Sequence, residues 1–166
     1  MKKNIPVIAI VGAHNSGKTT FIEKVVSNLS SKGYIVSVIK HDPKGKAETD
    51  KKGKDSYRIY EAGASQVIVA SPKKISSFVK TEHPLSPKEI IERFVIEEAD
   101  LIIIEGFKHY EGFDRFEVIR KEENRNLLTK DPKGVITDYY QYPVKFNINN
   151  EEDFVQYLIK NYIRRR

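Results

Sequence analysis

The chain has 166 residues, a length that fits one domain better than two, so we expect a single domain over residues 1–166. An apolar fraction of 39% and a charged fraction of 31% exclude a disordered protein, and the absence of cysteine excludes a disulfide framework. The formal net charge of +6 fits nucleic acid, acidic lipid or small anions as partners, or simply a solvated lysine-rich surface.

The beginning of the chain has the pattern of a strand, a helix and a second strand. Residues 5–11 form a short β-branched apolar run, which is typical of a strand buried on both faces of a parallel sheet. Apolar residues at helical spacing predict a helix over residues 17–31, which Gly33 ends. Residues 34–39 form a second buried strand, so this part of the chain is a βαβ unit.

Strands and helices continue to alternate after a polar segment. Residues 41–54 show no apolar periodicity, which predicts a functional loop or a disordered segment. Beyond it we predict helices over 56–62, 87–97 (with Ser86 as N-cap) and 150–162, and strands over 66–70, 75–79, 101–104, 116–120, 135–137 and 144–147. This order predicts an α/β fold with a mostly parallel, twisted sheet and helices on both faces.

A phosphate-binding loop lies between the first strand and the first helix. The pattern G-x-x-x-x-G-K-[ST] is matched by Gly12, Ala13, His14, Asn15, Ser16, Gly17, Lys18 and Thr19. Glycines let the backbone curl so that several N–H groups converge on one phosphate at the start of a helix. Lys18 places an ammonium on the β- and γ-phosphates, and Thr19 offers a hydroxyl to Mg²⁺. We therefore predict a P-loop NTPase-like fold that binds a nucleoside triphosphate, with His14 and Asn15 contributing only their backbone.

Carboxylates next to the buried strands are candidates for the Mg²⁺ shell. Ligands of open α/β sheets lie beyond the carboxyl ends of the strands, which favours Glu105, after strand 101–104, over Asp100 before it. The alternative for Glu105 is a surface acid at a strand end. Asp42 follows the second strand and opens segment 41–54, which either senses the γ-phosphate, ordering around a triphosphate, or is an ordinary solvated loop. We do not expect His41 to bind zinc, because no cysteine or second histidine is near.

Five segments of the chain resemble the molybdopterin-guanine dinucleotide biosynthesis protein B (MobB) family. They are VGAHNSGKTT (11–20), VIKHD (38–42), GKDSYR (53–58), AGA (62–64) and DLIIIEGFK (100–108), in the family's order and at its approximate spacing. Very many proteins share the P-loop, whereas the combination of VIKHD, GKDSYR and EGFK is much more specific. The resemblance covers roughly the first two-thirds of the chain and weakens after Lys108.

The resemblance implies a small protein that binds GTP with Mg²⁺, hydrolyses it weakly and forms a homodimer. It also implies work beside the nucleotidyltransferase MobA, which joins GMP to molybdopterin, with molybdopterin as a further candidate ligand, in late assembly of the molybdenum cofactor. At the positions that match the family's motifs, the resemblance implies that Gly12 through Thr20 bind the phosphates and that Glu105 lies on the side of the site that binds Mg²⁺. The shared cleft is lined by Lys40, His41, Asp42, Lys54, Asp55 and Arg58.

The residue that reads the base is predicted from the same comparison. Asp138 follows strand 135–137, where the family has a similar Thr-Asp or Ser-Asp pair. Guanine presents N1–H and N2–H₂ donors on one edge, which a single carboxylate accepts, whereas adenine presents an acceptor at N1. We predict that Asp138 selects guanine; the alternative is an ordinary turn aspartate.

Three classes of function remain open, and a GTP-binding assembly factor is favoured. A kinase of a small metabolite would need a lid with several arginines, yet Arg58 is the only arginine in the first ninety residues. A nucleic-acid binder would need a recognisable motif or an aromatic stacking cluster, and the sequence has neither. No stretch is long and apolar enough to cross a bilayer, so we expect a cytoplasmic protein without membrane or nucleic-acid partners.

Overall fold

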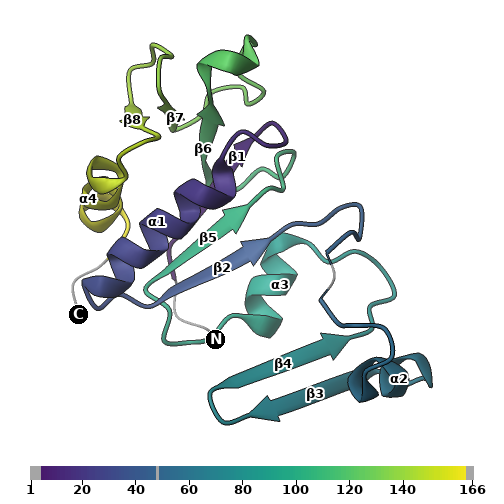
Figure 1. Cartoon of the computed structure of the whole chain (residues 1–166). Helices are drawn as coiled ribbons and strands as arrows, with labels where there is room; N and C mark the ends of the chain where they lie inside the picture. Colours follow the sequence, from purple (N-terminus) through teal and green to yellow (C-terminus); the bar gives the residue numbers. More distant parts are fainter. Residues whose placement is uncertain (1–4, 48, 164–166) are drawn as a thin grey trace. The chain divides into compact units, whose positions relative to one another are not determined.

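A computed structural model describes residues 5–47 and 49–163, and the chain divides into two compact units. Unit 1 combines Met1–His41 with Ile90–Arg166, and unit 2 is Asp42–Glu89. Unit 1 contains a six-stranded sheet, and unit 2 contains a two-stranded sheet (Figure 1). No helix in the described ranges is long and apolar enough to cross a membrane.

The sheet of unit 1 is parallel throughout, with the order β2-β5-β1-β6-β7-β8. Its strands are β1 (Val7–Gly12), β2 (Val36–Lys40), β5 (Leu101–Glu105), β6 (Asp114–Ile119), β7 (Gly134–Thr137) and β8 (Lys145–Asn147). Because all strands run the same way, their carboxyl ends share one edge of the sheet. The register at that edge sets Glu105 opposite both Ile10 and Lys40.

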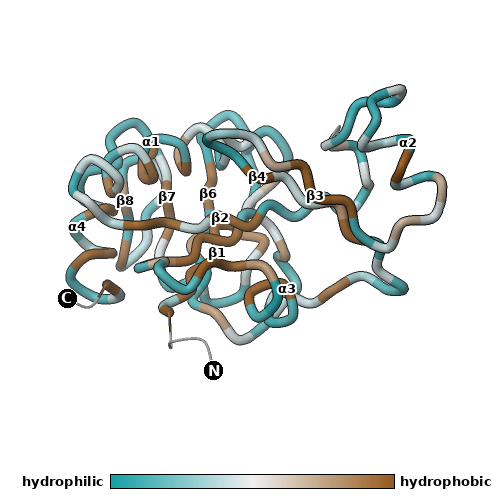
Figure 2. Tube along the Cα trace, turned by 90° about the horizontal axis from the view of Figure 1, so that it is seen from below, coloured by the Kyte–Doolittle hydropathy of each residue, from teal (hydrophilic) through white to brown (hydrophobic). Residues whose placement is uncertain are grey.

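Helices cover both faces of this sheet. α1 (Lys18–Ser31) and α4 (Glu152–Asn161) pack against one face in a single hydrophobic cluster. In this cluster the ring centroids of Phe21 and Phe154 are 5.5 Å apart. On the other face, Val95 and Ala99, which follow α3 (Pro87–Phe94), pack in a cluster with alternate residues of β1 and β5. Figure 2 shows apolar colour along the strands between these layers.

Burial on both faces explains the continuous apolar runs of the central strands. Ile8 and Ile10 of β1 belong to the α1 side of the sheet, whereas Ala9 and Val11 belong to the α3 side. Every residue of β5 is buried. The predicted α/β fold with a parallel sheet and helices on both faces matches this architecture.

The predicted end of α1 is confirmed, whereas the predicted end of α3 is wrong. α1 ends where Gly33 adopts φ +85°, and the N–H groups of Gly33 and Tyr34 return to carbonyls of the last turn, as the C-terminal glycine predicts. The helix predicted over 87–97 is too long, because α3 ends at Phe94. The β-branched pair Val95 and Ile96 follows, and Val95 turns into the core while Ile96 stays exposed.

Unit 2 is built around an antiparallel hairpin of β3 (Gln66–Ser71) and β4 (Lys74–Val79), with α2 (Asp55–Glu61) packing against β3. Both strands lie where they were predicted, but they form their own sheet and add nothing to the parallel one. A connection of two residues between strands permits only an antiparallel hairpin.

Candidate functional site

The P-loop is the turn that joins the end of β1 to the start of α1. Gly12 and Gly17 both have positive φ, at +148° and +93°, and a Cβ on Gly12 would lie 2.6 Å from the carbonyl oxygen of Val118. A side chain at Gly12 is therefore excluded by β6. Gly17 is the N-cap of α1 and offers no side chain to the first-turn N–H groups, which leaves them to an anion.

The ammonium of Lys18 lies folded over this loop. Its Nζ donates to the carbonyls of Gly12 at 3.3 Å and of Ala13, and to Ser16 Oγ at 3.4 Å. Burial lowers the pKa of Lys18 below its ordinary value, and the nearby Glu105 carboxylate opposes that shift. These carbonyls hold the ammonium at the loop, where phosphate oxygens would compete for it. Of the other loop positions, Ser16 is buried, whereas His14, Asn15 and Thr20 are exposed.

A second group of contacts joins α1, β2 and β5 beside the loop. The Thr19 hydroxyl donates to Glu105 Oε1 at 2.7 Å, and Lys40 Nζ donates to Glu105 Oε2 at 2.8 Å and to Thr19 Oγ1 at 3.2 Å. Glu105 is only 8% exposed, so its carboxylate is bonded to Thr19 and Lys40 in place of water. The parallel register that places Lys40 opposite Glu105 creates this arrangement.

The donor types beside the loop fit a magnesium ion. A hydroxyl and a carboxylate are hard oxygen ligands, and Mg²⁺ commonly takes one or two such protein groups together with phosphate oxygens and water. Within residues 5–47 and 49–163, no group of three or more His, Asp or Glu side chains could hold a metal by itself.

The segment after β2 was expected to contribute His41 and Asp42. The His41 ring stacks on the Phe107 ring, with the ring centroids 3.8 Å apart. A Cβ added to Gly106 would lie 2.9 Å from the Cβ of His41, so this position has no room for a side chain. The Asp42 carboxylate accepts the Ala47 N–H at 2.6 Å and so closes a turn within unit 2. Its place in the metal shell stays a prediction.

The other residues assigned to the cleft lie in unit 2. Arg58 and Asp55 are exposed on α2 and pair with each other at 3.7 Å, and Lys54 is the N-cap of that helix. Between β2 and α2, residues 41–47 and 49–54 contain no helix or strand. Whether this segment senses the γ-phosphate stays a prediction.

Asp138 lies at the carboxyl edge of the sheet, directly after β7. Its Oδ1 accepts the backbone N–H of Lys121 at 3.1 Å, which joins the ends of β6 and β7, and the residue is exposed. Thr137 Oγ1 accepts the N–H groups of Tyr139 and Tyr140 and thus fixes the following turn. The carboxylate is on the β6–β8 side of the P-loop, away from Glu105.

The residues after β6 were missed by the sequence analysis. Arg120 Nε is 4.0 Å from the position that a Cβ would take on Gly17, so its side chain borders the P-loop. Glu117, fully buried in β6, accepts Arg125 Nη1 at 2.6 Å and the N–H groups of Leu128 and Thr129 at 2.9 and 2.7 Å. The available signal was an arginine at the carboxyl end of the predicted strand 116–120, the end at which ligands of parallel sheets lie.

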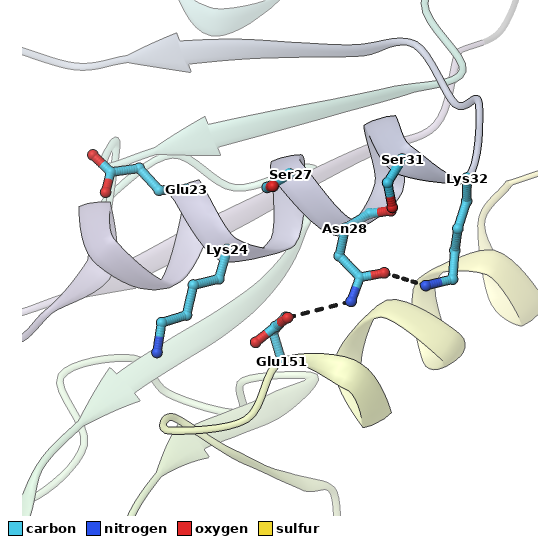
Figure 3. Close-up of a pocket in the computed structure, with 7 residues that line it drawn as sticks. All are labelled: Glu23, Lys24, Ser27, Asn28, Ser31, Lys32 and Glu151. Atoms are coloured by element: carbon cyan, nitrogen blue, oxygen red, sulfur yellow. Dashed lines mark hydrogen bonds between the residues drawn. The ribbon is translucent and has the colours of Figure 1, made fainter.

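A surface hollow between α1 and α4 is not part of this site (Figure 3). Its polar groups bind each other: the Asn28 amide donates to Glu151 at 3.2 Å and to Glu152 at 2.8 Å, and Lys32 bonds to the Asn28 carbonyl oxygen. The hollow is lined by Glu23, Lys24, Ser27, Asn28, Ser31, Lys32 and Glu151, and none of these belongs to the P-loop. The contacts join two helices and leave the P-loop as the candidate site.

Comparison with known proteins identifies relatives of the chain. A family model described as MobB, molybdopterin guanine dinucleotide synthesis protein B, matches residues 7–138. The molybdopterin-guanine dinucleotide biosynthesis adapter protein of Haemophilus influenzae is 35% identical over 147 residues, which cover 89% of this chain and 81% of that protein. The adapter protein of Escherichia coli is 38% identical over 112 residues, which cover 66% of this chain and 63% of that protein.

Solved structures agree with these sequence relatives. A crystal structure of Bacillus subtilis MobB has a TM-score of 0.76 at 26% identity and covers 98% of this chain and 100% of that chain. A MobB homolog from Bacillus stearothermophilus, at 19% identity and a TM-score of 0.66, shares the fold. The predicted P-loop NTPase-like fold and the predicted family resemblance are both confirmed.

Proposed function

The chain belongs to the molybdopterin guanine dinucleotide synthesis protein B (MobB) family, and from this premise we propose that it is an adapter protein of molybdopterin guanine dinucleotide formation that works through bound GTP and Mg²⁺. One observation carries the nucleotide part of the proposal: Thr19, Glu105 and Lys40 are bonded together beside a P-loop whose Lys18 ammonium lies over the loop. A site that binds only the nucleoside would not need this concentration of charge.

Mg²⁺ would be held by the Thr19 hydroxyl and the Glu105 carboxylate, with phosphate oxygens and water completing its shell. When bound, the ion neutralises negative charge on the β- and γ-phosphates. The Lys18 ammonium would donate hydrogen bonds to the same phosphates, and the N–H groups in the first turn of α1 would supply neutral donors. Asp138, on the other side of the loop, is the proposed acceptor of the guanine edge.

Slow hydrolysis follows from the way in which Glu105 is occupied. Both of its carboxylate oxygens accept hydrogen bonds, one from Thr19 and one from Lys40, so neither oxygen is free to accept a proton from water. A carboxylate held in this way is a poor base for a water molecule. We propose a turnover far below about 10 per second, the middle of the range for metabolic enzymes.

We propose a homodimer on the basis of the β3–β4 hairpin. Ile68 and Ile75 lie on the same face of this hairpin, because Ile68 is registered with Ser77 and Ile75 with Ala70. These two side chains are 59% and 73% exposed. An apolar face of this kind favours a protein contact, and sedimentation of the wild type and of Ile75→Glu tests whether self-association depends on it.

The function is tested by adding the purified chain to a reconstituted reaction in which a MobA-like nucleotidyltransferase joins GMP to molybdopterin. The wild type should stimulate product formation when GTP is present, and Lys18→Ala should not. Lys24→Ala, on the exposed side of the same helix, is the matched control and should act like the wild type. Stimulation by Lys18→Ala equal to that of the wild type would show that nucleotide binding has no part in the activity.

The alternative function is a P-loop kinase that transfers the γ-phosphate to a small metabolite. It makes the opposite prediction in an assay with labelled nucleotide and a panel of acceptor metabolites. Label that appears in an acceptor at the rate of a metabolic enzyme would replace the adapter proposal. The adapter proposal expects label only in inorganic phosphate, released slowly.

A further inference from the structure

The P-loop is flanked by charged groups on both of its sides, and the phosphate and metal contacts proposed above use no side chain from the β6 side. β1 lies between β5 and β6 in the sheet. Glu105 and Lys40, at the carboxyl ends of β5 and β2, lie on one side. Arg120 directly follows β6, whose Val118 is registered with Gly12, and so lies on the other side.

The Arg120 side chain reaches back to the loop and is incompletely bonded there. Its Nε is 4.0 Å from the position of a Cβ on Gly17, the residue at which α1 begins. Among the residues that the structure describes, no hydrogen-bond partner contacts this buried Nε. Its Nη1 makes a single long contact of 3.5 Å with Glu122, and the side chain is 34% exposed. A buried N–H without a partner costs free energy, which an incoming acceptor can recover.

Neighbouring groups hold the backbone of Arg120 in place. Its N–H donates to Glu123 Oε1 at 2.8 Å, and Glu123 Oε2 accepts Arg125 Nε at 2.7 Å. Arg125 is in turn bonded to the buried Glu117. Glu117 and Glu123 are therefore both bonded to Arg125, and within the described part of the chain the Arg120 guanidinium contacts only the Glu122 carboxylate, at 3.5 Å.

We propose that Arg120 is a nucleotide-binding residue that contacts the α-phosphate from the β6 side of the P-loop. The proposal rests on the nucleotide binding proposed above. A metal at Thr19 and Glu105 fixes the outer phosphates on the β5 side, so the phosphate chain must continue across the start of α1 towards β6 and Asp138. Arg120 borders the start of α1 on that side. Guanidinium groups suit phosphate oxygens because their parallel N–H donors match the oxygen geometry.

The test is calorimetric titration of GDP and of a non-hydrolysable GTP analogue, each with Mg²⁺, into the wild type and into Arg120→Ala. Since the α-phosphate is common to both ligands, both affinities should fall by the same factor, about tenfold to a hundredfold. Arg120→Lys keeps the charge and should lose less. Arg115→Ala, which removes an arginine from the other end of β6, should bind like the wild type.

A second measurement separates contact from a merely structural effect. At saturating GDP, the ³¹P resonance of the α-phosphorus should shift between the wild type and Arg120→Lys, while that of the β-phosphorus stays in place. Unchanged affinity in Arg120→Ala, or a shift confined to the β-phosphorus, would overturn the assignment. If Lys18→Ala has lost binding while Arg120→Ala binds normally, only the Arg120 inference fails. If the wild type binds neither ligand, the proposed function fails with it.

Discussion

The hydroxyl of Thr19 donates a 2.7 Å hydrogen bond to Glu105, although the two residues are 86 positions apart in the chain. Thr19 belongs to the first turn of α1, and Glu105 ends the buried strand β5. The bond therefore joins the phosphate loop to the carboxylate that we propose as a metal ligand. The fold itself thus brings together the two side chains that we propose for the metal.

Replacing Lys18 by alanine should weaken triphosphate binding by about tenfold to a hundredfold. The reason is the loss of a charged hydrogen bond, which is worth about 1.5–3 kcal/mol. Titration with a fluorescent GTP analogue measures the effect, and thermal unfolding checks that the variant is folded. A folded Lys18→Ala protein with wild-type affinity would remove the P-loop from the proposed function.

Replacing Glu105 by glutamine should lower the Mg²⁺ affinity of the nucleotide complex by about tenfold to a hundredfold. The amide keeps the size of the side chain but loses the charge that orients Thr19 and pairs with Lys40. Titrating Mg²⁺ into the nucleotide-bound protein measures this. Glu23→Gln, an exposed change on α1, is the control, and equal Mg²⁺ affinity in both variants would contradict the assignment.

Asp138→Asn should reduce the preference for GTP over ATP. A carboxylate only accepts hydrogen bonds, whereas an amide can turn its N–H₂ towards adenine N1. The asparagine oxygen can still accept the Lys121 N–H, so the turn should survive. Competition between GTP and ATP gives the ratio, with Asp131→Asn as the control. A wild type that binds both nucleotides equally would contradict the assignment of Asp138 to guanine.

Nucleotide binding should be accompanied by proton uptake as the pH approaches the lowered pKa of Lys18. Burial lowers the pKa of Lys18 in the free protein below 10.5, and bound phosphates should raise it again. Between these two values the complex holds more protons than the free protein, so affinity must fall as the pH rises through the lower pKa. Calorimetry in two buffers of different ionisation enthalpy counts the protons. Proton release on binding would reverse the sign and exclude this account.

Arg125→Met should destabilise the protein by about 3 kcal/mol or more, because it leaves the buried Glu117 carboxylate without its cation. The double variant Glu117→Gln, Arg125→Met should recover part of that loss, since no buried charge then remains. Urea unfolding measures both, and Arg93→Met, an exposed change on α3, serves as the control. A double variant no more stable than Arg125→Met would argue against a charge effect.

The P-loop turn, α1 and the place of Glu105 at the end of a buried strand could be predicted from the sequence, because each depends on local pattern. Glycines at fixed spacing, an apolar helical stripe and an acid after a buried run are all readable along the chain. The buried pairing of Glu117 with Arg125 could not be found in the same way. Whether a charged side chain at a strand points into the core depends on the partner that it meets, and Arg125 meets Glu117 only in the folded loop. Charged residues otherwise predict exposure.

The hairpin of unit 2 was predicted only in part. Its two strands were predicted, but their short connection between Ser71 and Lys74 was not used to infer an antiparallel pair. Helix 87–97 was correct at its start, where Ser86 and Glu89 bond reciprocally, and wrong at its end. Capping pairs are readable from sequence, whereas helix ends set by packing are not.

The position of β5 has a consequence for synthesis. β1 and β2 are made first, yet they are not neighbours, because β5 lies between them and emerges from the ribosome only after all of unit 2. Until then each of the two strands has an unpaired edge, and Thr19 has no Glu105 to bond. The nascent chain therefore carries the complete P-loop sequence without the site, and its exposed apolar strands need protection from aggregation during that interval.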